Sequence, residues 1–545
     1  MINKIAASVS FLVLFFLFFY SVQAQSPKRE LRGVWIATVL NIDYPRVATP
    51  DDRYLAKEWT EMLEKLKPLG INALFVQIRS TSDAFYVSDS IPWSNWLTGQ
   101  SGLAPANGYD PLAYMIRTAH EMGFEFHAWL NPYRASMDNQ TREDFSPSHV
   151  LNKHPEWCLL YNKRYIMNPG LPEVRKHVTG VVEEIVRKYD VDGIHFDDYF
   201  YPYKNGNEPF RDLNTFQQFG SRFSSVDDWR RDNVDQLIQS VATVIKKVKP
   251  RVQFGISPFG VWRNSYVDPL GSDTHAGVTC YDDLYADVRK WLQLGWIDYV
   301  VPQDYWATGF NLADHEKVAR WWADNSYGKP VYIGYESGRI GQVSKREPNW
   351  IDPNEMPRQL SIARGLKSVK GAVFFSAKSL LYNPLGFSDS LKNNYFREFA
   401  IPPEVVKDTS MLACEPSEIR AIIYENTGVH LRWKTSCNVK KNLPFQYLIY
   451  RFNWGKVDFS DSRNILAIIP EDVKELTFYD KNAKPDDTYL YAVTVTDCKN
   501  NEMVLNTARL RLPIQDLPSH AVLMQLNNMS SKYKKKKKFW LFAWL

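Results

Sequence analysis

Short apolar runs alternate, from residue 31 to residue 378, with segments in which apolar residues recur every three or four positions. These two patterns predict buried strands and amphipathic helices, respectively. The predicted strands are residues 31–39, 71–79, 124–133, the start of 190–203, 252–260, 296–306, 330–336 and 371–378. The predicted helices are residues 54–67, 109–122, a helix that begins at 168, and then 229–247, 281–294, 315–325 and 356–366. This alternation predicts an α/β chain with a TIM-like (β/α)8 barrel. An open doubly wound sheet is the alternative, but no Gly-rich phosphate turn follows the early strands.

The pattern changes beyond Pro402. Residues 429–434, 445–451, 490–496 and 508–512 mostly alternate apolar and polar positions, with turn-rich segments and no helical pattern between them. They predict a small all-β sandwich. Trp433 and Tyr491 resemble the pattern of fibronectin type III domains. We therefore expect a barrel over 25–402, a fibronectin type III-like sandwich over 403–515, and a disordered basic and apolar tail over 516–545.

The start of the chain has the three regions of a secretory signal peptide. Lys4 precedes an apolar run over residues 5–20, and Val22-Gln23-Ala24 places small residues at the expected cut. Residues 1–24 are thus predicted to be removed on export to the periplasm or the cell surface of a bacterium. An uncleaved membrane anchor is the alternative, and no second apolar run of about 20 residues follows.

Charge and cysteine content exclude several functions. The net charge is +5, but Lys4 and the six lysines at 532 and 534–538 supply 7 of the 66 basic residues, which leaves −2 for the rest. A body without basic bias does not predict nucleic-acid binding. The lysine-rich tail predicts at most weak contact with an anionic membrane surface. The 5 cysteines fit no zinc motif; Cys437 and Cys498 could pair after export.

The candidate chemistry centres on residues 190–203. A strand with period-two alternation places His195, Asp197 and Tyr199 on one face, and Ile194, Phe196 and Asp198 on the other. Charged groups at the carboxyl end of a buried strand are costly unless they have a function. In a (β/α)8 barrel, that end is where active sites lie.

The other predicted strands also end in polar or aromatic residues. The polar ends are Arg79, His127, Asn131, Ser257, Gln303, Asp304, Glu336 and Lys378. The aromatic residues expected around the mouth are Trp93, Trp96, Tyr133, Tyr199, Tyr201, Trp262, Tyr305 and Trp306. Carboxylates among aromatic residues are typical of glycosidases, in which one acid protonates the leaving oxygen and another acts as nucleophile or base.

Several blocks also resemble one family, in the same order along the chain. They are Arg32-Gly-Val-Trp35, Asn131-Pro-Tyr-Arg134, residues 193–202, Ser257-Pro-Phe-Gly-Val-Trp-Arg263, Tyr281-Asp-Asp-Leu284 with Trp296-Ile-Asp-Tyr299, and Pro302-Gln-Asp-Tyr-Trp306. The chain is similar over residues 31–399 to the glycosyl-hydrolase-like family 10 group (DUF187). The resemblance implies a secreted bacterial barrel that cleaves N-acetylhexosamine polysaccharides, including peptidoglycan glycan stripped of its peptides.

The strand over residues 193–197 is also similar to the fourth strand of α-amylase-like barrels, Gly-x-Arg-x-Asp, with His195 in place of the arginine. The resemblance implies that Asp197 is the nucleophile or base. Because the fifth strand ends in Ser257-Pro258 without a glutamic acid, the acid is expected to be Asp304 or Glu336. The sequence leaves open which of the two it is, and whether the reaction retains or inverts the anomeric configuration.

The remaining candidates are expected to bind the glycan, and no cofactor or metal is expected. These are Arg79, His127, Asn131, Tyr133, His195, Asp198, Tyr199, Trp262, Gln303, Tyr305, Trp306 and Lys378. Two alternatives stay open. One is a metal-dependent polysaccharide deacetylase that uses His195, Asp197, Asp198, Asp273 and His275 as ligands. The other is a glycan-binding protein without catalysis.

Overall fold

The computed structural model describes residues 26–404, 419–424, 428–433, 446–470, 476–484, 487–497 and 500–511. The predicted signal peptide, the C-terminal tail, and Cys414, Cys437 and Cys498 lie outside these residues. Within the described part of the chain, no helix is long and apolar enough to cross a membrane.

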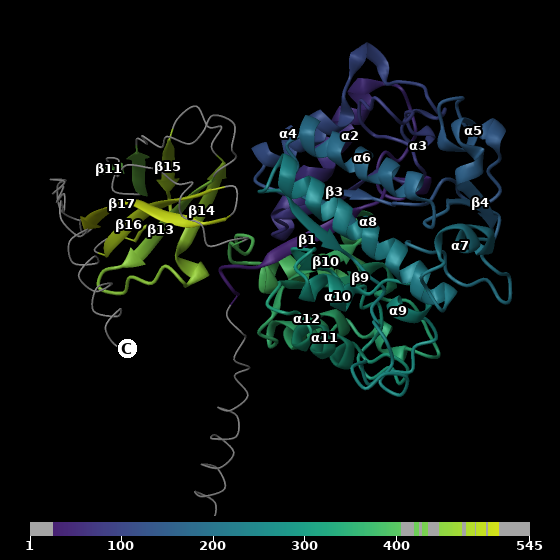
Figure 1. Cartoon of the computed structure of the whole chain (residues 1–545). Helices are drawn as coiled ribbons and strands as arrows, with labels where there is room; N and C mark the ends of the chain where they lie inside the picture. Colours follow the sequence, from purple (N-terminus) through teal and green to yellow (C-terminus); the bar gives the residue numbers. More distant parts are fainter. Residues whose placement is uncertain are drawn as a thin grey trace, which may run out of the picture.

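Residues 26–404 contain a closed barrel of eight parallel strands, as the sequence predicts (Figure 1). The strands are β1 (Leu31–Ile36), β2 (Ala73–Arg79), β3 (Glu125–Leu130), β6 (Gly193–Phe196), β7 (Gln253–Ile256), β8 (Tyr299–Val300), β9 (Val331–Glu336) and β10 (Val369–Phe375). Their spatial order is β1-β10-β9-β8-β7-β6-β3-β2, and β2 pairs with β1 to close the barrel.

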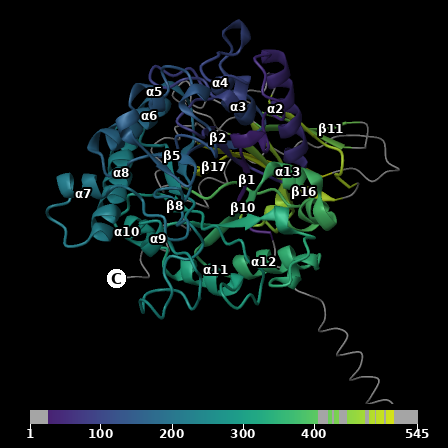
Figure 2. The same cartoon turned by 90° about the vertical axis from the view of Figure 1, so that its right-hand side faces the viewer.

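Helices surround the strands (Figure 2). The longer ones are α2 (Asp52–Leu66), α4 (Pro111–Glu121), α6 (Pro172–Lys188), α8 (Val226–Val248), α11 (His315–Asp324) and α12 (Glu355–Arg364). The shorter ones are α3 (Asn95–Thr98), α5 (Val150–Lys153), α7 (Leu213–Phe219), α9 (Cys280–Asp283), α10 (Val288–Gln293), α13 (Ala377–Tyr382) and α14 (Phe387–Ser390).

Local sequence explains where several helices begin. The carboxylate of Asp51 accepts hydrogen bonds from the amides of Arg53 and Tyr54 at the start of α2. Asp110 caps α4 in the same way, with Pro111 in the first turn, where its missing N–H costs nothing. The helix predicted over 281–294 is instead two short helices, because Asp287 caps a new start at α10. A hairpin of β4 (Cys158–Tyr161) and β5 (Arg164–Met167) was not predicted.

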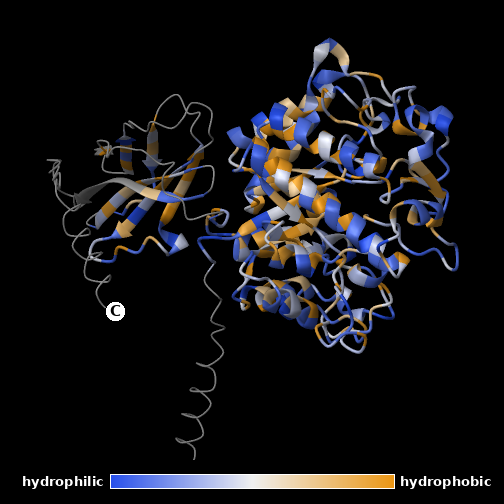
Figure 3. Cartoon of the chain, in the orientation of Figure 1, coloured by the Kyte–Doolittle hydropathy of each residue, from blue (hydrophilic) through white to orange (hydrophobic). Residues whose placement is uncertain are grey.

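The barrel strands separate two sets of buried side chains. Ile194 and Phe196 belong to the apolar layer between strands and helices, and the strands are among the most hydrophobic parts of the molecule (Figure 3). Inside the barrel, the rings of Phe75 and His127 stack at 4.6 Å between centroids. His195 and Tyr299 fill the space beside them. In β6, the predicted alternation of inward and outward side chains is therefore correct as far as Phe196, where the strand ends.

The described C-terminal residues form two antiparallel sheets, as predicted for a sandwich. One sheet has the order β11 (Ile419–Tyr424), β12 (Gly428–Trp433) and β15 (Thr477–Asp480). The other has β14 (Ile465–Pro470), β13 (Gln446–Asn453), β16 (Thr488–Thr496) and β17 (Glu502–Arg511). The likeness to fibronectin type III domains stays a prediction.

The segment before β1 contacts both parts of the chain. Lys28 donates to the carboxylate of Glu502 at 2.5 Å and to the carbonyl of Phe459 at 2.7 Å. The side chain of Asn500 donates to Glu125 of β3 at 2.8 Å. The sandwich thus contacts the amino-terminal end of the barrel, opposite the end where active sites lie.

Candidate active site

A cavity of about 310 Å³ lies at the carboxyl ends of the barrel strands. Its walls come from segments at or after the ends of β1, β2, β3, β6, β7, β8 and β10. The lining residues are Trp35, Ala37, Val39, Leu40, Ile42, Gln77, Trp129, Arg134, Met137, Arg164, Asp197, Asp198, Tyr199, Ser257, Gln303, Tyr305 and Phe375. This is the end of the barrel at which the sequence predicts the chemistry.

Asp197 accepts hydrogen bonds from more protein groups than Asp198 does. Its Oδ2 accepts a hydrogen bond from Trp129 Nε1 at 3.1 Å and a second from Asn131 Nδ2. Its Oδ1 has only a long contact from the amide of Tyr199, at 3.3 Å. The side chain is 4% exposed. Oδ1 is therefore the oxygen that is least occupied by protein donors.

Asp198 lines the same cavity, although strand alternation places it on the other face. β6 ends at Phe196, and the chain then turns, so that the amide of Phe200 donates to the carbonyl of Asp198 at 2.9 Å. The carboxylate of Asp198 accepts a hydrogen bond from the hydroxyl of Tyr203 and is 3% exposed. The predicted opposite orientation of the two aspartates is wrong because period-two alternation holds only within a strand.

Burial and like charge raise the pKa of both aspartates. Burial is the larger cause for Asp197, and the negative charge of Asp198 is the second, so that the pKa of Asp197 rises to about 7. The positive charge of Arg134 and the donors around Asp197 oppose this rise. Burial also raises the pKa of Asp198, while the hydroxyl of Tyr203 lowers it. The pKa of both carboxyl groups is therefore raised, and that of Asp197 lies close to neutral pH.

A layer of polar side chains holds Asp197 in place. Asn131, which donates to Asp197, accepts hydrogen bonds from Gln77 Nε2 at 2.6 Å and from Arg134 at 2.7 Å. Gln77 in turn accepts from the amides of Thr38 and Val39 at 3.0 and 2.9 Å. The ends of β1, β2 and β3 thus fix the direction of one catalytic candidate on β6.

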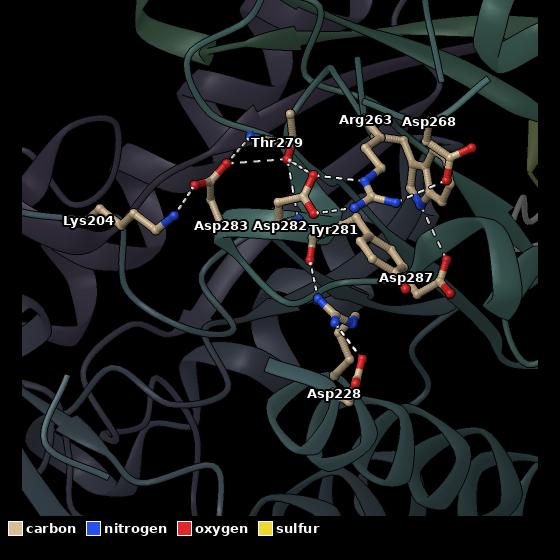
Figure 4. A network of polar contacts seen from close by, with 11 residues as sticks. Lys204, Asp228, Arg263, Asp268, Thr279, Tyr281, Asp282, Asp283 and Asp287 are labelled. Atoms are coloured by element: carbon tan, nitrogen blue, oxygen red, sulfur yellow. Dashed lines mark hydrogen bonds and ion pairs between the residues drawn. The ribbon is translucent and has the colours of Figure 1, made fainter. Parts of the chain in front are cut away.

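A second network holds the loop that carries Tyr203 (Figure 4). The next residue, Lys204, donates to Asp283 at 2.6 Å, and the same carboxylate accepts from the amide of Thr279 at 2.7 Å. The neighbouring Asp282 pairs with Arg263 through two hydrogen bonds, of 2.8 and 2.9 Å. The loops after β6 and β7 are thereby tied together, which positions the donor to Asp198.

The structure does not place Asp304 in the cavity. Its Oδ2 lies 2.8 Å from His315 Nδ1, and both side chains are fully buried. The two groups form an ion pair rather than a well-aligned hydrogen bond. Burial raises the pKa of Asp304, and the charge of His315 opposes that rise. The position of Asp304, in a buried pair with His315 and away from the cavity lining, gives no support to the catalytic role that the sequence predicts.

Glu336 lies close to the cavity without being among its lining residues. It ends β9, next to Phe375 in the sheet register. Burial raises its pKa. The charges of Glu336, Asp198 and Asp197 all raise the pKa of the lining residue Tyr305, after burial as the main cause. Glu336 and the pair therefore both act on Tyr305, and the catalytic role of Glu336 stays a prediction.

Four residues predicted to bind the glycan are buried below or beside the cavity. Arg79 donates to the carbonyls of Asn131 and Pro132. His127 and His195 both contact the hydroxyl of Tyr299, at 2.9 and 3.3 Å, inside the barrel. Burial keeps the pKa of His195 well below its usual value, so this ring is neutral. Tyr133 belongs to the apolar core.

Three further residues predicted to bind the glycan lie outside the cavity. Trp262 donates to Asp287 at 3.2 Å, and Trp306 packs edge-on against Phe259. Lys378 is exposed and lines a different cavity. Of the predicted aromatic ring, only Tyr199 and Tyr305 line the cavity. Long loops carry the other aromatic residues, and strand patterns give no information on where a loop turns.

Sequence reasoning missed several residues of the site. Trp35, Gln77, Trp129 and Arg134 line the cavity, and Trp129 and Arg134 act directly on Asp197. A signal was present for Trp129, which alternates with His127 and Asn131 along β3. Arg134 follows Asn131 in one of the blocks that carry the family resemblance.

The residues proposed for a metal site do not gather. Asp273 pairs with Lys317 at 2.6 Å, and His275 stacks on Tyr266. Within the described ranges, no group of three or more His, Cys, Asp or Glu side chains is arranged to hold a metal ion.

A (β/α)8 barrel whose cavity holds two adjacent buried carboxyl groups, one of them with a pKa raised to about 7, has the site of a glycoside hydrolase. Residues 30–352 match the family Glycosyl hydrolase-like 10. The chain is 42% identical over 487 residues to the glycosyl hydrolase YngK of Bacillus subtilis, which covers 89% of this chain and 93% of YngK. It therefore belongs to the Glycosyl hydrolase-like 10 family.

Other relatives are more distant. The glycosyl hydrolase DigH of Escherichia coli K12 is 39% identical over 373 residues, which covers 64% of this chain and 84% of DigH. Among solved structures, the glycoside hydrolase domain of PgaB (BpsB) from Bordetella bronchiseptica aligns with a TM-score of 0.42 at 12% identity. That alignment covers 67% of this chain and 99% of the PgaB domain.

Proposed function

We propose that this glycoside hydrolase is exported and cleaves glycosidic bonds in an N-acetylhexosamine polysaccharide, in particular peptidoglycan glycan without peptides. The observation that carries the reaction type is the pair of Asp197 and Asp198 in the cavity of the barrel. Family membership supports hydrolysis of a glycosidic bond. The identity of the sugar rests on the family resemblance.

Asp197 is proposed as the general acid, which revises the nucleophile or base role that the sequence implies. Its pKa of about 7, raised by burial and by the negative charge of Asp198, suits a carboxyl group that must carry a proton near neutral pH. Oδ2 is held by Trp129 and Asn131, so the proton resides on Oδ1. From there it passes to the glycosidic oxygen as the bond to the anomeric carbon breaks. Water then adds to that carbon, and its proton returns to the carboxylate of Asp197.

Asp198 is proposed to act as the anion of the pair. Positive charge develops at the anomeric carbon in an oxocarbenium-like transition state, and a buried carboxylate stabilises it more strongly than water does. The hydroxyl of Tyr203 holds this carboxylate. Tyr199, Tyr305, Trp35 and Trp129 supply apolar surface for a sugar ring.

The test is to incubate the purified protein with peptide-free peptidoglycan glycan in water enriched in ¹⁸O, and to weigh the products. Hydrolysis predicts shorter glycans, each new reducing end carrying one ¹⁸O. A variant with both Asp197→Asn and Asp198→Asn is the matched control and should give no shortening.

Two outcomes would contradict the proposal. Release of acetate without chain shortening would indicate a deacetylase, and repeating that assay with a chelator would test for a metal. Binding of glycan without any product would indicate a binding protein.

Export is proposed from the pattern of residues 1–24. N-terminal sequencing of the protein from a bacterial host should begin at Gln25 in the periplasmic or extracellular fraction. Recovery of Met1 in the cytoplasmic fraction would contradict export. Weak contact of the lysine-rich tail with anionic membrane surfaces is part of the same proposal, and co-sedimentation with anionic vesicles would test it.

A further inference from the structure

A second cavity, of about 640 Å³, adjoins the catalytic one. It lies between the loop after β1, helix α2 and helix α13. Ile42 lines both cavities. The mechanism proposed above makes no use of this larger space.

A strained ridge separates the two cavities. Leu40 and Asn41 have φ angles of 55° and 53°, a left-handed conformation that is uncommon for residues other than glycine. Strain of this kind persists only where the surroundings impose it, and it is frequent at binding sites. Asp43, which follows the ridge, accepts from the amides of Ala37 and Lys378, at 2.8 and 2.7 Å, and from the hydroxyl of Ser376 at 2.7 Å, and so joins the loop after β1 to the start of α13.

Exposed apolar side chains follow the path from one cavity to the other. Leu40 on the ridge is 53% exposed, and Leu381 and Tyr382 on α13 are 37% and 85% exposed. Large apolar side chains that are exposed next to one another often mark a binding surface, whereas single exposed apolar side chains are ordinary. A tyrosine that is open on one face can stack against the apolar face of a sugar ring.

The lining of the second cavity has three acids, Asp43, Glu58 and Glu61, and three bases, Arg46, Lys65 and Lys378. Arg46 is paired with Glu58 at 3.0 Å, and Glu61 lies 3.8 Å from Lys57, a residue that does not line the cavity. The carboxylate of Asp43 is buried and occupied by its three donors. Within the described residues, no ion pair involves Lys65 or Lys378, and both are exposed at the cavity. Lys65 and Lys378 are therefore the two cations of the lining that can form a direct ion pair with a bound anion, although the charge of Lys378 also acts on Asp43.

We propose that this second cavity binds a sugar unit that carries a carboxylate, in the same glycan strand whose bond is cleaved beside it. Tyr382 contacts the sugar ring, and Lys65 and Lys378 contact the carboxylate. Muramic acid units have such a carboxylate on their lactyl group once the peptide is removed, whereas chitin-type glycans have none. The inference rests on the proposed function and adds a binding site that selects acidic glycans.

The test measures binding separately from cleavage. The full chain with Asp197→Asn and Asp198→Asn is titrated calorimetrically with peptide-free peptidoglycan hexasaccharide, and with the same hexasaccharide after its carboxylates are methyl-esterified. Both titrations are repeated after adding Lys65→Met and Lys378→Met. Lys392→Met, a change of another exposed lysine, is the matched control. Tyr382→Ala tests the stacking contact.

An exposed ion pair is worth up to about a fivefold change in affinity. We therefore expect the two lysine changes to weaken binding of the free acid on the order of tenfold, and binding of the ester by less than twofold. Lys392→Met should change neither. Equal affinity for acid and ester, or an equal effect of the lysine changes on both, would overturn the inference while leaving the proposed function intact. Lysine-dependent binding of the acid by a protein whose unmodified form cleaves no glycan would support the site and reject the proposed function.

Discussion

The pair Asp197 and Asp198 and the single Asp304 are all buried acids that follow an apolar strand, but their surroundings differ. Asp197 and Asp198 follow β6, and Asp304 follows β8, each after an apolar strand. Asp197 has a second carboxylate as its neighbour and lines a cavity. Asp304 has His315 at 2.8 Å and lines none of the described cavities. The partner and the open space, rather than the strand pattern, distinguish the proposed catalytic pair from an acid in a buried ion pair.

The largest difference should appear in turnover. Asp198→Asn removes the anion proposed to stabilise the transition state, while the amide keeps the shape and can still accept from Tyr203. We expect kcat on peptide-free glycan to fall on the order of 10³-fold. A melting temperature close to that of the unmodified protein would show that the variant is folded. A loss of less than tenfold would remove Asp198 from the mechanism.

Asp304→Asn should have the opposite profile. Removing one member of a buried ion pair leaves the other charge without a partner, so the free energy of unfolding should fall by about 3 kcal/mol. Turnover should stay within about threefold, because Asp304 does not line the catalytic cavity. Chemical denaturation and steady-state kinetics on the same sample would measure both quantities. A 10³-fold loss of turnover with normal stability would restore the acid role that the sequence predicts.

The fold could be predicted from the sequence because each strand and helix depends on local apolar spacing. All eight predicted barrel strands are present, although β8 is only Tyr299–Val300, far shorter than residues 296–306. Bridges between Gln303 and its neighbours continue the sheet in isolated pairs. The break between α9 and α10 was missed because apolar spacing continues across it, whereas the capping contact of Asp287 depends on its side-chain direction.

The site could be predicted only in part. The sequence identified Asp197 and Asp198 as candidates, but the turn after Phe196 brings both into one cavity against the alternation. The roles of Asn131 and Arg134 depend on contacts between neighbouring strands, which a single strand's pattern does not contain. His315 lies beside Asp304 in space, but it belongs to α11, and no spacing rule in the sequence links that helix to β8.

A smaller effect should appear in stability. The pKa of Asp197 in the folded protein, about 7, lies above its ordinary value of 3.8. Between these values the folded state binds more protons than the unfolded state, so this group's contribution to stability falls as pH rises from about 4 to 7. Asp197→Asn removes the titrating carboxyl group, and with it this fall in stability at higher pH. We expect a melting temperature a few degrees above that of the unmodified protein at pH 8, and a difference that shrinks towards pH 4. A lower melting temperature at pH 8 would indicate that the ionised form is the one the fold stabilises.

The most direct test of whether Asp197 and Asp198 form a coupled pair, with Asp197 as the acid, is the pH dependence of kcat/KM. The informative part is the alkaline limb, the range in which kcat/KM falls as pH rises. An acid must be protonated to act, so kcat/KM should fall as pH rises through about 7, the pKa of Asp197. Because the charge of Asp198 is one cause of that high pKa, Asp198→Asn should lower it and move the limb of the residual activity to lower pH. The residual rate can be followed with an activated aryl glycoside over pH 4 to 9. A limb that stays in place in Asp198→Asn, or that moves to higher pH, would contradict the assignment.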